Sequence, residues 1–246
     1  MTRRRRPPPS PRRRTRPTVE GTSPRPTIRL AEPAELGEAY ELLHEVMHAD
    51  PDQMPHIPET APEILAATTH GPKGFQTALA HRLSNEPTAP SPDPPAVYTV
   101  VAVEADTIVS AALFGPPLRL IQEVQTTTTD PRRQQMMVAL GLMGISKLYA
   151  VRTLDTHQRH GIGNQLIRRG LDIFLNEVGG LYVYGNCSPT LTRWYQHQGF
   201  TVGPADEPLT IDPGAVFGFP VSLSAGPGEC MFRISQQDHR RHPRPR

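Results

Sequence analysis

The chain has 246 residues, 37% of them hydrophobic, which favours one domain with appendages over two equal domains. Its net charge of +2 hides an acidic body, because residues 27–238 carry −10 whereas 1–26 carry +8 and 239–246 add four arginines. Two cysteines exclude a disulfide scaffold, and no apolar run suits a membrane span or a secretory signal, so we expect a cytoplasmic protein.

The two ends of the chain differ from its middle. Residues 1–26 and 237–246 are rich in arginine and proline and cannot bury enough apolar surface to offset the entropy of ordering, so we expect disordered tails. Residues 27–236 are expected to form the folded domain. The arginines leave open an electrostatic contact with nucleic acid or another acidic partner.

In the first half of the domain, apolar residues recur with the periods of strands and helices. We expect, in order, a strand at 27–31, a helix from Pro33 to about Pro51, a weaker helix within 60–83, a proline-rich loop at 84–96, and an antiparallel hairpin of strands 97–104 and 107–114.

In the second half, Asp130 followed by Pro131 is typical of a helix N-terminus. We expect a helix to about Gly144, a strand at 145–153, a helix near 162–178, a strand at 181–184, a short helix at 189–198, loops over 203–228 and a strand at 229–234. Strands and helices mix without an internal repeat, which predicts an α/β or α+β fold.

The turn between the strand 145–153 and the next helix is rich in glycine. It reads Gln158-Arg159-His160-Gly161-Ile162-Gly163. Glycines there allow a ligand to approach the backbone closely, and the following helix offers free N–H groups to a phosphate. A dinucleotide-binding fingerprint would need a third glycine in place of Leu166, and a P-loop would need a lysine, so both are excluded.

Thirty-two residues after Gly163 stands Tyr195, within Trp194-Tyr195-Gln196-His197-Gln198-Gly199-Phe200. A strand leading into QxxGxG, then a helix, a strand and a helix with WYxxxGF, resembles the GNAT superfamily of acetyl-CoA-dependent N-acetyltransferases. The resemblance covers about residues 145–202. It implies a mixed, mostly antiparallel central sheet with helices on both faces.

The resemblance also implies a set of functional residues. Acetyl-CoA would be the co-substrate, with no metal, and Tyr195 would protonate the departing thiolate. The residues that would bind acetyl-CoA follow the strand, the turn and the next strand: Val151, Arg152, Thr153, Gln158, Arg159, His160, Gly161, Ile162, Gly163, Asn164 and Ser188. A backbone N–H of the strand would stabilise the oxyanion.

Several positions depart from the family's pattern. Thr153-Leu154-Asp155 stands where Val-x-Pro is frequent, and Ser188 where asparagine is frequent. The strand 145–153 carries no glutamate, so the base that would deprotonate the amine is open among Glu104, Glu123, Asp155, a water relay and an amine that arrives neutral.

A competing motif lies in the first helix. His44-Glu45-Val46-Met47-His48 spells HExxH, in which two histidines bind zinc and the glutamate acts as base. Its surroundings lack the metzincin extension, since Pro51 and Met54 occupy those positions. The alternative is an amphipathic helix whose histidines flank its apolar stripe. The resemblance to the GNAT superfamily implies that this helix borders the acceptor site, where His44 or His48 could touch substrate.

The expected function is transfer of acetyl to a primary amine by direct attack in a ternary complex. The acidic body favours a cationic acceptor such as a polyamine, an aminoglycoside, a lysine or a protein N-terminus. The alternatives are a non-catalytic acyl-CoA-binding module, a zinc peptidase, and an acetyltransferase acting on aminoacyl-tRNA through the arginine-rich ends.

Overall fold

A computed structural model describes residues 25–47, 57–85, 94–127, 129–211 and 221–241. Their centre is a seven-stranded sheet in the order β1-β2-β3-β4-β5-β9-β6. Every neighbouring pair is antiparallel except β4 and β5. The strands are β1 Thr27–Leu30, β2 Tyr98–Glu104, β3 Thr107–Gly115, β4 Ile145–Thr153, β5 Tyr182–Cys187, β6 Thr201–Ala205 and β9 Cys230–Ser235, beside a separate pair of β7 Leu209–Ile211 and β8 Val221–Leu223.

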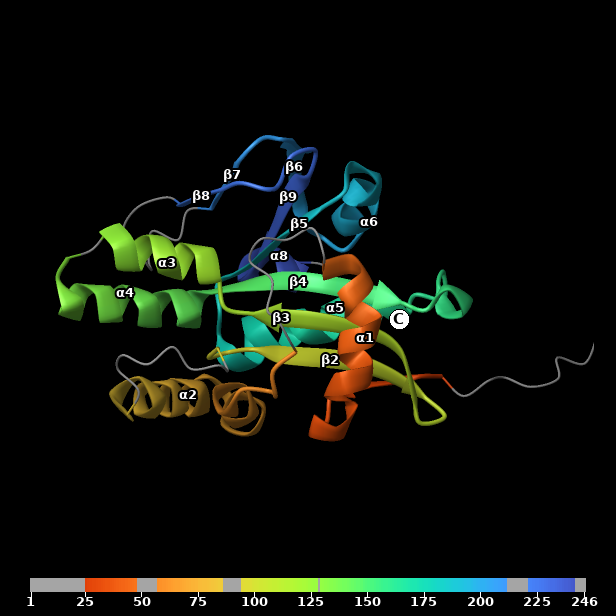
Figure 1. Ribbon diagram of the computed structural model, residues 1–246, viewed down its shortest axis with the longest axis horizontal. Helices are drawn as coiled ribbons and strands as arrows, with labels where there is room; N and C mark the ends of the chain where they lie inside the picture. Colours follow the sequence, from red (N-terminus) through yellow and green to blue (C-terminus); the bar gives the residue numbers. More distant parts are fainter. Residues whose placement is uncertain (1–24, 48–56, 86–93, 128, 212–220, 242–246) are drawn as a thin grey trace, which may run out of the picture.

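Helices lie on both faces of the sheet (Figure 1). α1 crosses in front of β3 and β4, α5 lies behind the sheet, and α3 and α4 project together from one end. The helices are α1 Leu36–Met47, α2 Pro62–Asn85, α3 Leu118–Thr127, α4 Pro131–Gly144, α5 Ile162–Leu171, α6 Thr192–His197 and α8 Gln236–Arg241, and α5 continues into a π-helical segment, η3, Asp172–Val178. The predicted fold class, a mixed and mostly antiparallel sheet with helices on both faces, is confirmed.

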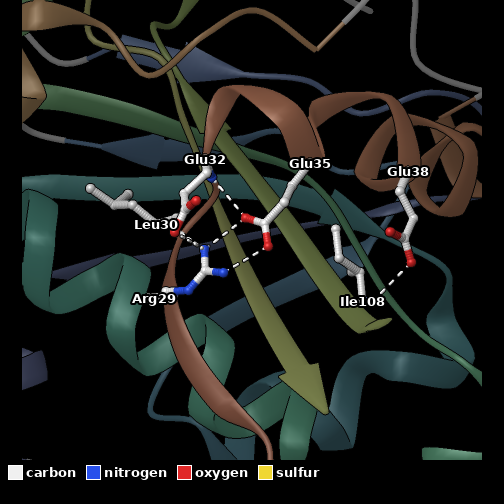
Figure 2. A network of polar contacts seen from close by, with 6 residues as sticks. All are labelled: Arg29, Leu30, Glu32, Glu35, Glu38 and Ile108. Atoms are coloured by element: carbon white, nitrogen blue, oxygen red, sulfur yellow. Dashed lines mark hydrogen bonds and ion pairs between the residues drawn. The ribbon is translucent and has the colours of Figure 1, made fainter. Parts of the chain in front are cut away.

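A network of polar contacts attaches α1 to the edge of the sheet (Figure 2). Arg29 of β1 donates two hydrogen bonds of 2.7 Å to the carboxylate of Glu35, which also accepts the backbone N–H of Glu32 at 2.8 Å. The Arg29 guanidinium lowers the pKa of Glu35. One turn later, Glu38 accepts the backbone N–H of Ile108 at 2.9 Å. Bidentate ion pairs of this kind fix orientation, so the start of α1 is held against β1 and β3.

Short sequence motifs, such as turn residues and helix caps, predicted most of these helices and strands. Ala105 and Asp106 take left-handed conformations, with φ of 48° and 62°, as a two-residue hairpin requires. The Asp130 side chain accepts the N–H of Arg132 at 3.0 Å and begins α4 as predicted. The sequence prediction did not include α3, between the expected hairpin and the helix that begins at Pro131. It also did not include β6, β7 and β8, which lie in or beside the loops expected over 203–228.

The structure has a helix within the range that we expected to be the C-terminal tail. Residues 236–241 form α8, whose start is capped by reciprocal bonds between Ser235 and Asp238. His239 is buried, and its Nε2 lies 2.9 Å from Asp172 Oδ1 in η3. These contacts order a segment that its charge alone would leave in solvent. The tails at 1–24 and 242–246 lie outside the described residues.

The core lies between the sheet and its helices. α5 buries one face, with Ile162, Leu166 and Ile167 each no more than 5% exposed, against β2 and β3. Among the described helices, none is long and apolar enough to cross a membrane.

Candidate functional site

The strands β4 and β5 separate along their length. They pair in parallel only where residues 145–147 meet 182–184. Beyond these pairs β4 continues to Thr153 and β5 to Cys187, and within the described chain their facing edges are not paired with each other. A bulge at Tyr149, the extra residue opposite β3, lies where the strands diverge. Unpaired backbone groups seek hydrogen-bond partners, so the opening suits an elongated ligand with amide groups.

A tight turn at the open end of β4 leads into α5. The Gln158 side chain donates to Thr153 O at 3.2 Å and to Asp155 Oδ1 at 2.7 Å, which fastens the turn to the strand. Arg159 and Gly161 take left-handed conformations, with φ of 64° and 77°. A Cβ at Gly161 would meet no atom within 4 Å, so the turn faces open space. No side chain of the described residues caps α5, which leaves its first amides available to an anion.

Two residues that follow the turn connect α5 to α6. A Cβ at Gly163 would lie 3.5 Å from both Thr153 Oγ1 and the Trp194 ring, so this glycine is packed between the two. The Trp194 indole donates to Asn164 Oδ1 at 2.8 Å. This bond, between residues thirty positions apart, was not predicted. It holds α6, and with it Tyr195, in a fixed position relative to the glycine turn.

Tyr195 is buried, with 4% of its surface exposed. Its ring stacks on Phe232, with centroids 3.9 Å apart, and meets Phe200 and Trp194 edge-on. Burial, and then the nearby Cys187, raises the pKa of Tyr195 above its usual value. The phenol therefore keeps its proton throughout the neutral range and can act as a proton donor.

The predicted residues on β4 differ in what their side chains do. Val151 is half-buried against the core. The Arg152 guanidinium turns toward α1, where its Nη2 lies 3.2 Å from Glu45 Oε2. The Thr153 hydroxyl is 2.7 Å from that of Ser110 on β3. These three side chains are engaged elsewhere, so these residues would contact a ligand in the opening chiefly through their backbone N–H and C=O groups.

The remaining predicted cofactor-binding residues lie around the turn and the end of β5. His160 is exposed, whereas the side chain of Ile162 is only 5% exposed and belongs to the core, so only its amide faces the turn. Ser188 follows β5 and accepts the N–H of Thr190 at 3.4 Å, beginning the short turn before α6. The two strands and the turn thus bring the predicted residues to one end of the sheet.

The candidate bases are engaged in other contacts. Glu104 Oε2 lies 2.8 Å from His157 Nε2, and the other nitrogen of this ring is 2.8 Å from the hydroxyl of Thr156. Asp155 accepts from Gln158. The side chain of Glu123 is outside the described residues. Neither described carboxylate is selected as base by its geometry.

The described HExxH residues lie mostly on the exposed side of α1, with only Met47 buried. The His44 ring lies 5.3 Å from that of Tyr40, and Glu45 pairs with Arg152. His48 lies outside the described residues. Within the described ranges, no three histidine, cysteine or acidic side chains are grouped as a metal site.

No model of a known protein family matches the chain, and no curated protein matches it in sequence. Among solved structures, it is similar to an acetyltransferase of the GNAT family from Streptococcus pneumoniae, with 11% identity and a TM-score of 0.43 over 85% of this chain and 99% of that one. It is similar to a variant of spermidine N-acetyltransferase from Vibrio cholerae, with 12% identity and a TM-score of 0.44 over 87% and 95%. It is also similar to yncA from Salmonella typhimurium, solved with its cofactor acetyl-CoA, with 16% identity and a TM-score of 0.45 over 86% and 94%. These three similarities are all at low sequence identity and at TM-scores below 0.5.

Proposed function

We propose that this chain transfers the acetyl group of acetyl-CoA to a primary amine, which attacks directly within a ternary complex. The observation that carries the proposal is the opening between β4 and β5, with the glycine turn and the uncapped first amides of α5 at its open end. A phosphate-bearing ligand with an amide-rich arm matches both parts at once. Tyr195, held beside the turn through Trp194, supplies the third part of the site.

The residues around the opening fit acetyl-CoA, which would bring the activated thioester as acetyl donor. The pyrophosphate would be held by backbone amides of the turn and of α5, from Gln158 through Gly163 to Asn164, with Arg159 and His160 beside them. The open space at Gly161 leaves room for it. The backbone of Val151, Arg152 and Thr153 would pair with the pantetheine arm and offer an N–H to the developing oxyanion, with Ser188 at the far side.

The raised pKa of Cys187 supports direct attack by the amine. Burial raises the pKa of Cys187 to about 12, so this thiol stays protonated and is a poor nucleophile for an acetyl-cysteine route. The Tyr195 phenol also stays protonated and would give its hydroxyl proton to the departing sulfur. The site would therefore need one proton donor and no covalent intermediate.

The acceptor is proposed to be a cationic amine. The acidic body of the chain, with a net charge of −10 over 27–238, attracts cations. Since Glu104 and Asp155 are hydrogen-bonded elsewhere, an amine that loses its proton to water before attack is the simplest route.

Calorimetric titration of the full-length protein with acetyl-CoA tests the cofactor site. Gly161→Glu places bulk and negative charge where the pyrophosphate should lie, and we expect it to abolish binding. Gly228→Glu is the matched control, because Gly228 also has a positive φ, 76°, and also faces open space, but lies in the turn before β9. Equal binding by both variants would refute the cradle.

An assay of turnover distinguishes an acetyltransferase from a non-catalytic acyl-CoA-binding module. The binding-competent protein would be assayed for release of free coenzyme with polyamines, aminoglycosides, lysine peptides and peptide N-termini as acceptors. Acetylation of any of these establishes the transferase, whereas binding without turnover on the whole panel favours the module.

A further inference from the structure

Two free cysteines face each other across neighbouring strands of the central sheet. Cys187, the last residue of β5, and Cys230, the first residue of β9, are register partners in an antiparallel pair. Residues directly opposite each other in such a pair have Cα atoms about 4.5–5.5 Å apart. A disulfide joins Cα atoms about 4.4–6.8 Å apart, so the strands already hold the two cysteines at the separation that a bond needs.

The two thiols also lie on the same face of the sheet, because directly opposed side chains share a face. Phe232, two residues beyond Cys230 on that face, stacks on Tyr195 of α6. The Thr192 hydroxyl of the same helix donates to Cys230 Sγ at 3.8 Å. Burial, and then the neighbouring Cys230, raises the pKa of Cys187, as expected for two sulfurs that lie close together. Register and side-chain contacts therefore place both sulfurs beneath α6, beside Tyr195.

Both cysteines are buried, but they adjoin the exposed ends of their strands. Cys187 and Cys230 are 5% and 4% exposed. Ser188, which follows β5, is exposed, and a Cβ at Gly228, two residues before β9, would meet no atom within 4 Å. The ends of strands open at a lower free energy than their centres. A brief opening of this end exposes a thiol, restores its ordinary acidity and admits a small oxidant.

We propose that Cys187 and Cys230 form a reversible disulfide when the protein meets a hydroperoxide. With hydrogen peroxide, one thiolate attacks an oxygen, which breaks the O–O bond and leaves a sulfenic acid and a hydroxide. The second thiolate displaces hydroxide from that sulfur, and the S–S bond forms. The two thiol protons convert the hydroxides to water, so the peroxide gains the two electrons that the thiols lose. A dithiol reductant reverses the reaction by thiol–disulfide exchange.

The bond joins the two strands against which Tyr195 packs. It closes a loop that contains α6, β6 and the pair of β7 and β8. Such a cross-link stabilises a fold by restricting the unfolded chain. It also ties the end of β5 to β9 beneath α6, where opening of the strands loosens the stack of Tyr195 on Phe232. Oxidation therefore changes the stability of this side of the sheet, whichever reaction the site catalyses.

Hydrogen peroxide added to the reduced, full-length protein tests the proposal. We expect the intact mass to fall by about 2 Da, because two thiol hydrogens are lost. After denaturation, iodoacetamide should label both cysteines of the reduced protein and neither cysteine of the oxidised protein. The oxidised protein should unfold at a higher urea concentration, and dithiothreitol should restore the original mass and midpoint. In Cys187→Ser and in Cys230→Ser, the remaining cysteine should give a sulfenic acid that dimedone traps.

The matched control keeps two cysteines but moves one of them to the other face of β9. It combines Cys230→Ser with Met231→Cys, because successive side chains of a strand point to opposite faces. This variant should not lose the two hydrogens. The proposal is overturned by an unchanged parent mass at peroxide concentrations that convert free cysteine to cystine, by a bond between two chains, or by an equal disulfide yield in the control. These assays need no acetyl donor, so their failure does not bear on the proposed transferase.

Discussion

The two parts of the central sheet differ in how they are held together. β1 to β4 form a continuous antiparallel ladder, with α1 fastened across it by Arg29, Glu35 and Glu38. β5, β9 and β6 form a second ladder that meets the first only where residues 145–147 and 182–184 pair. The first part is a scaffold of four strands paired along most of their length, and the second packs against the buried Tyr195. The proposed site therefore lies where the pairing between β4 and β5 ends.

The largest expected effect is on turnover, and it tests whether Tyr195, which packs on the second part, acts as the general acid. Tyr195→Phe should lower turnover about 100-fold or more, because a positioned general acid contributes that much, while leaving the fold intact. Tyr98→Phe is the matched control in the first part. The Tyr98 hydroxyl donates to Gly170 O at 2.9 Å, so its loss should reduce stability by about 1–3 kcal/mol and spare turnover. Kinetics and urea unfolding of both variants would check the contrast, and unchanged turnover in Tyr195→Phe would remove the acid role.

The next prediction concerns the junction of the two parts. A Cβ at Gly185 would lie 2.8 Å from Leu148 O and 2.5 Å from the Phe232 ring, so Gly185→Ala should force the strands apart. We expect a loss of about 2–3 kcal/mol in the free energy of unfolding. Gly37→Ala in α1 meets nothing within 4 Å and should stabilise the protein slightly, as alanine does in helices. If Gly185→Ala unfolds at the parent's denaturant concentration, the junction is looser than described.

Part of the alkaline pH dependence of stability should come from the second part. Burial raises the pKa of Cys187 from an ordinary 9.0 to about 12, so the unfolded chain loses this proton first as pH rises. Stability is then complete below about pH 9 and falls as pH rises toward 12, by about 1 kcal/mol between pH 8 and pH 10. Urea unfolding across this window would measure the slope, and Cys187→Ala should reduce it, while the raised pKa values of Tyr195 and Tyr98 leave a residual slope. An identical slope in the variant would assign the effect to another group.

The smallest effect concerns the brace of the first part. Glu35→Gln removes the bidentate partner of Arg29 and should cost about 1 kcal/mol at neutral pH, since the pair is partly exposed. Because the pKa of Glu35 is lowered in the fold, this contribution is present above the usual carboxyl range and disappears as pH falls through it. Glu32→Gln, at a more exposed and longer contact with Arg29, should change thermal stability less. A larger loss from Glu32→Gln would contradict the order of the two contacts.

Local chemistry made the glycine turn and several helix ends predictable from the sequence. Asp130 before Pro131 begins a helix, and Gly161 permits a positive φ, for reasons contained in a few neighbouring residues. α8 was not predicted, because its order depends on Asp172, far away in the chain. Charge alone favoured a tail there.

The resemblance to GNAT acetyltransferases, carried by the glycine turn and Tyr195, proposed residues for the site but not the environment of those residues. The burial of Tyr195 depends on Phe232, which comes from β9, and the opening depends on how far β4 and β5 pair. Neither the extent of pairing between distant strands nor an aromatic stack assembled from them leaves a local periodic signal.

The excursion between β3 and β4 has a consequence for engineering. Gly115 and Lys147 are register partners, so the chain leaves and re-enters the sheet at one rung, with α3 and α4 in between. A two-residue hairpin could join these antiparallel strands. The actual connection is longer by roughly four doublings in length, which adds only ~2 kcal/mol to the entropic cost of closing the loop. Burial of Leu120 and Leu142 easily offsets it. Residues 116–144 are thus a natural place to graft a foreign segment while the order of the strands is kept.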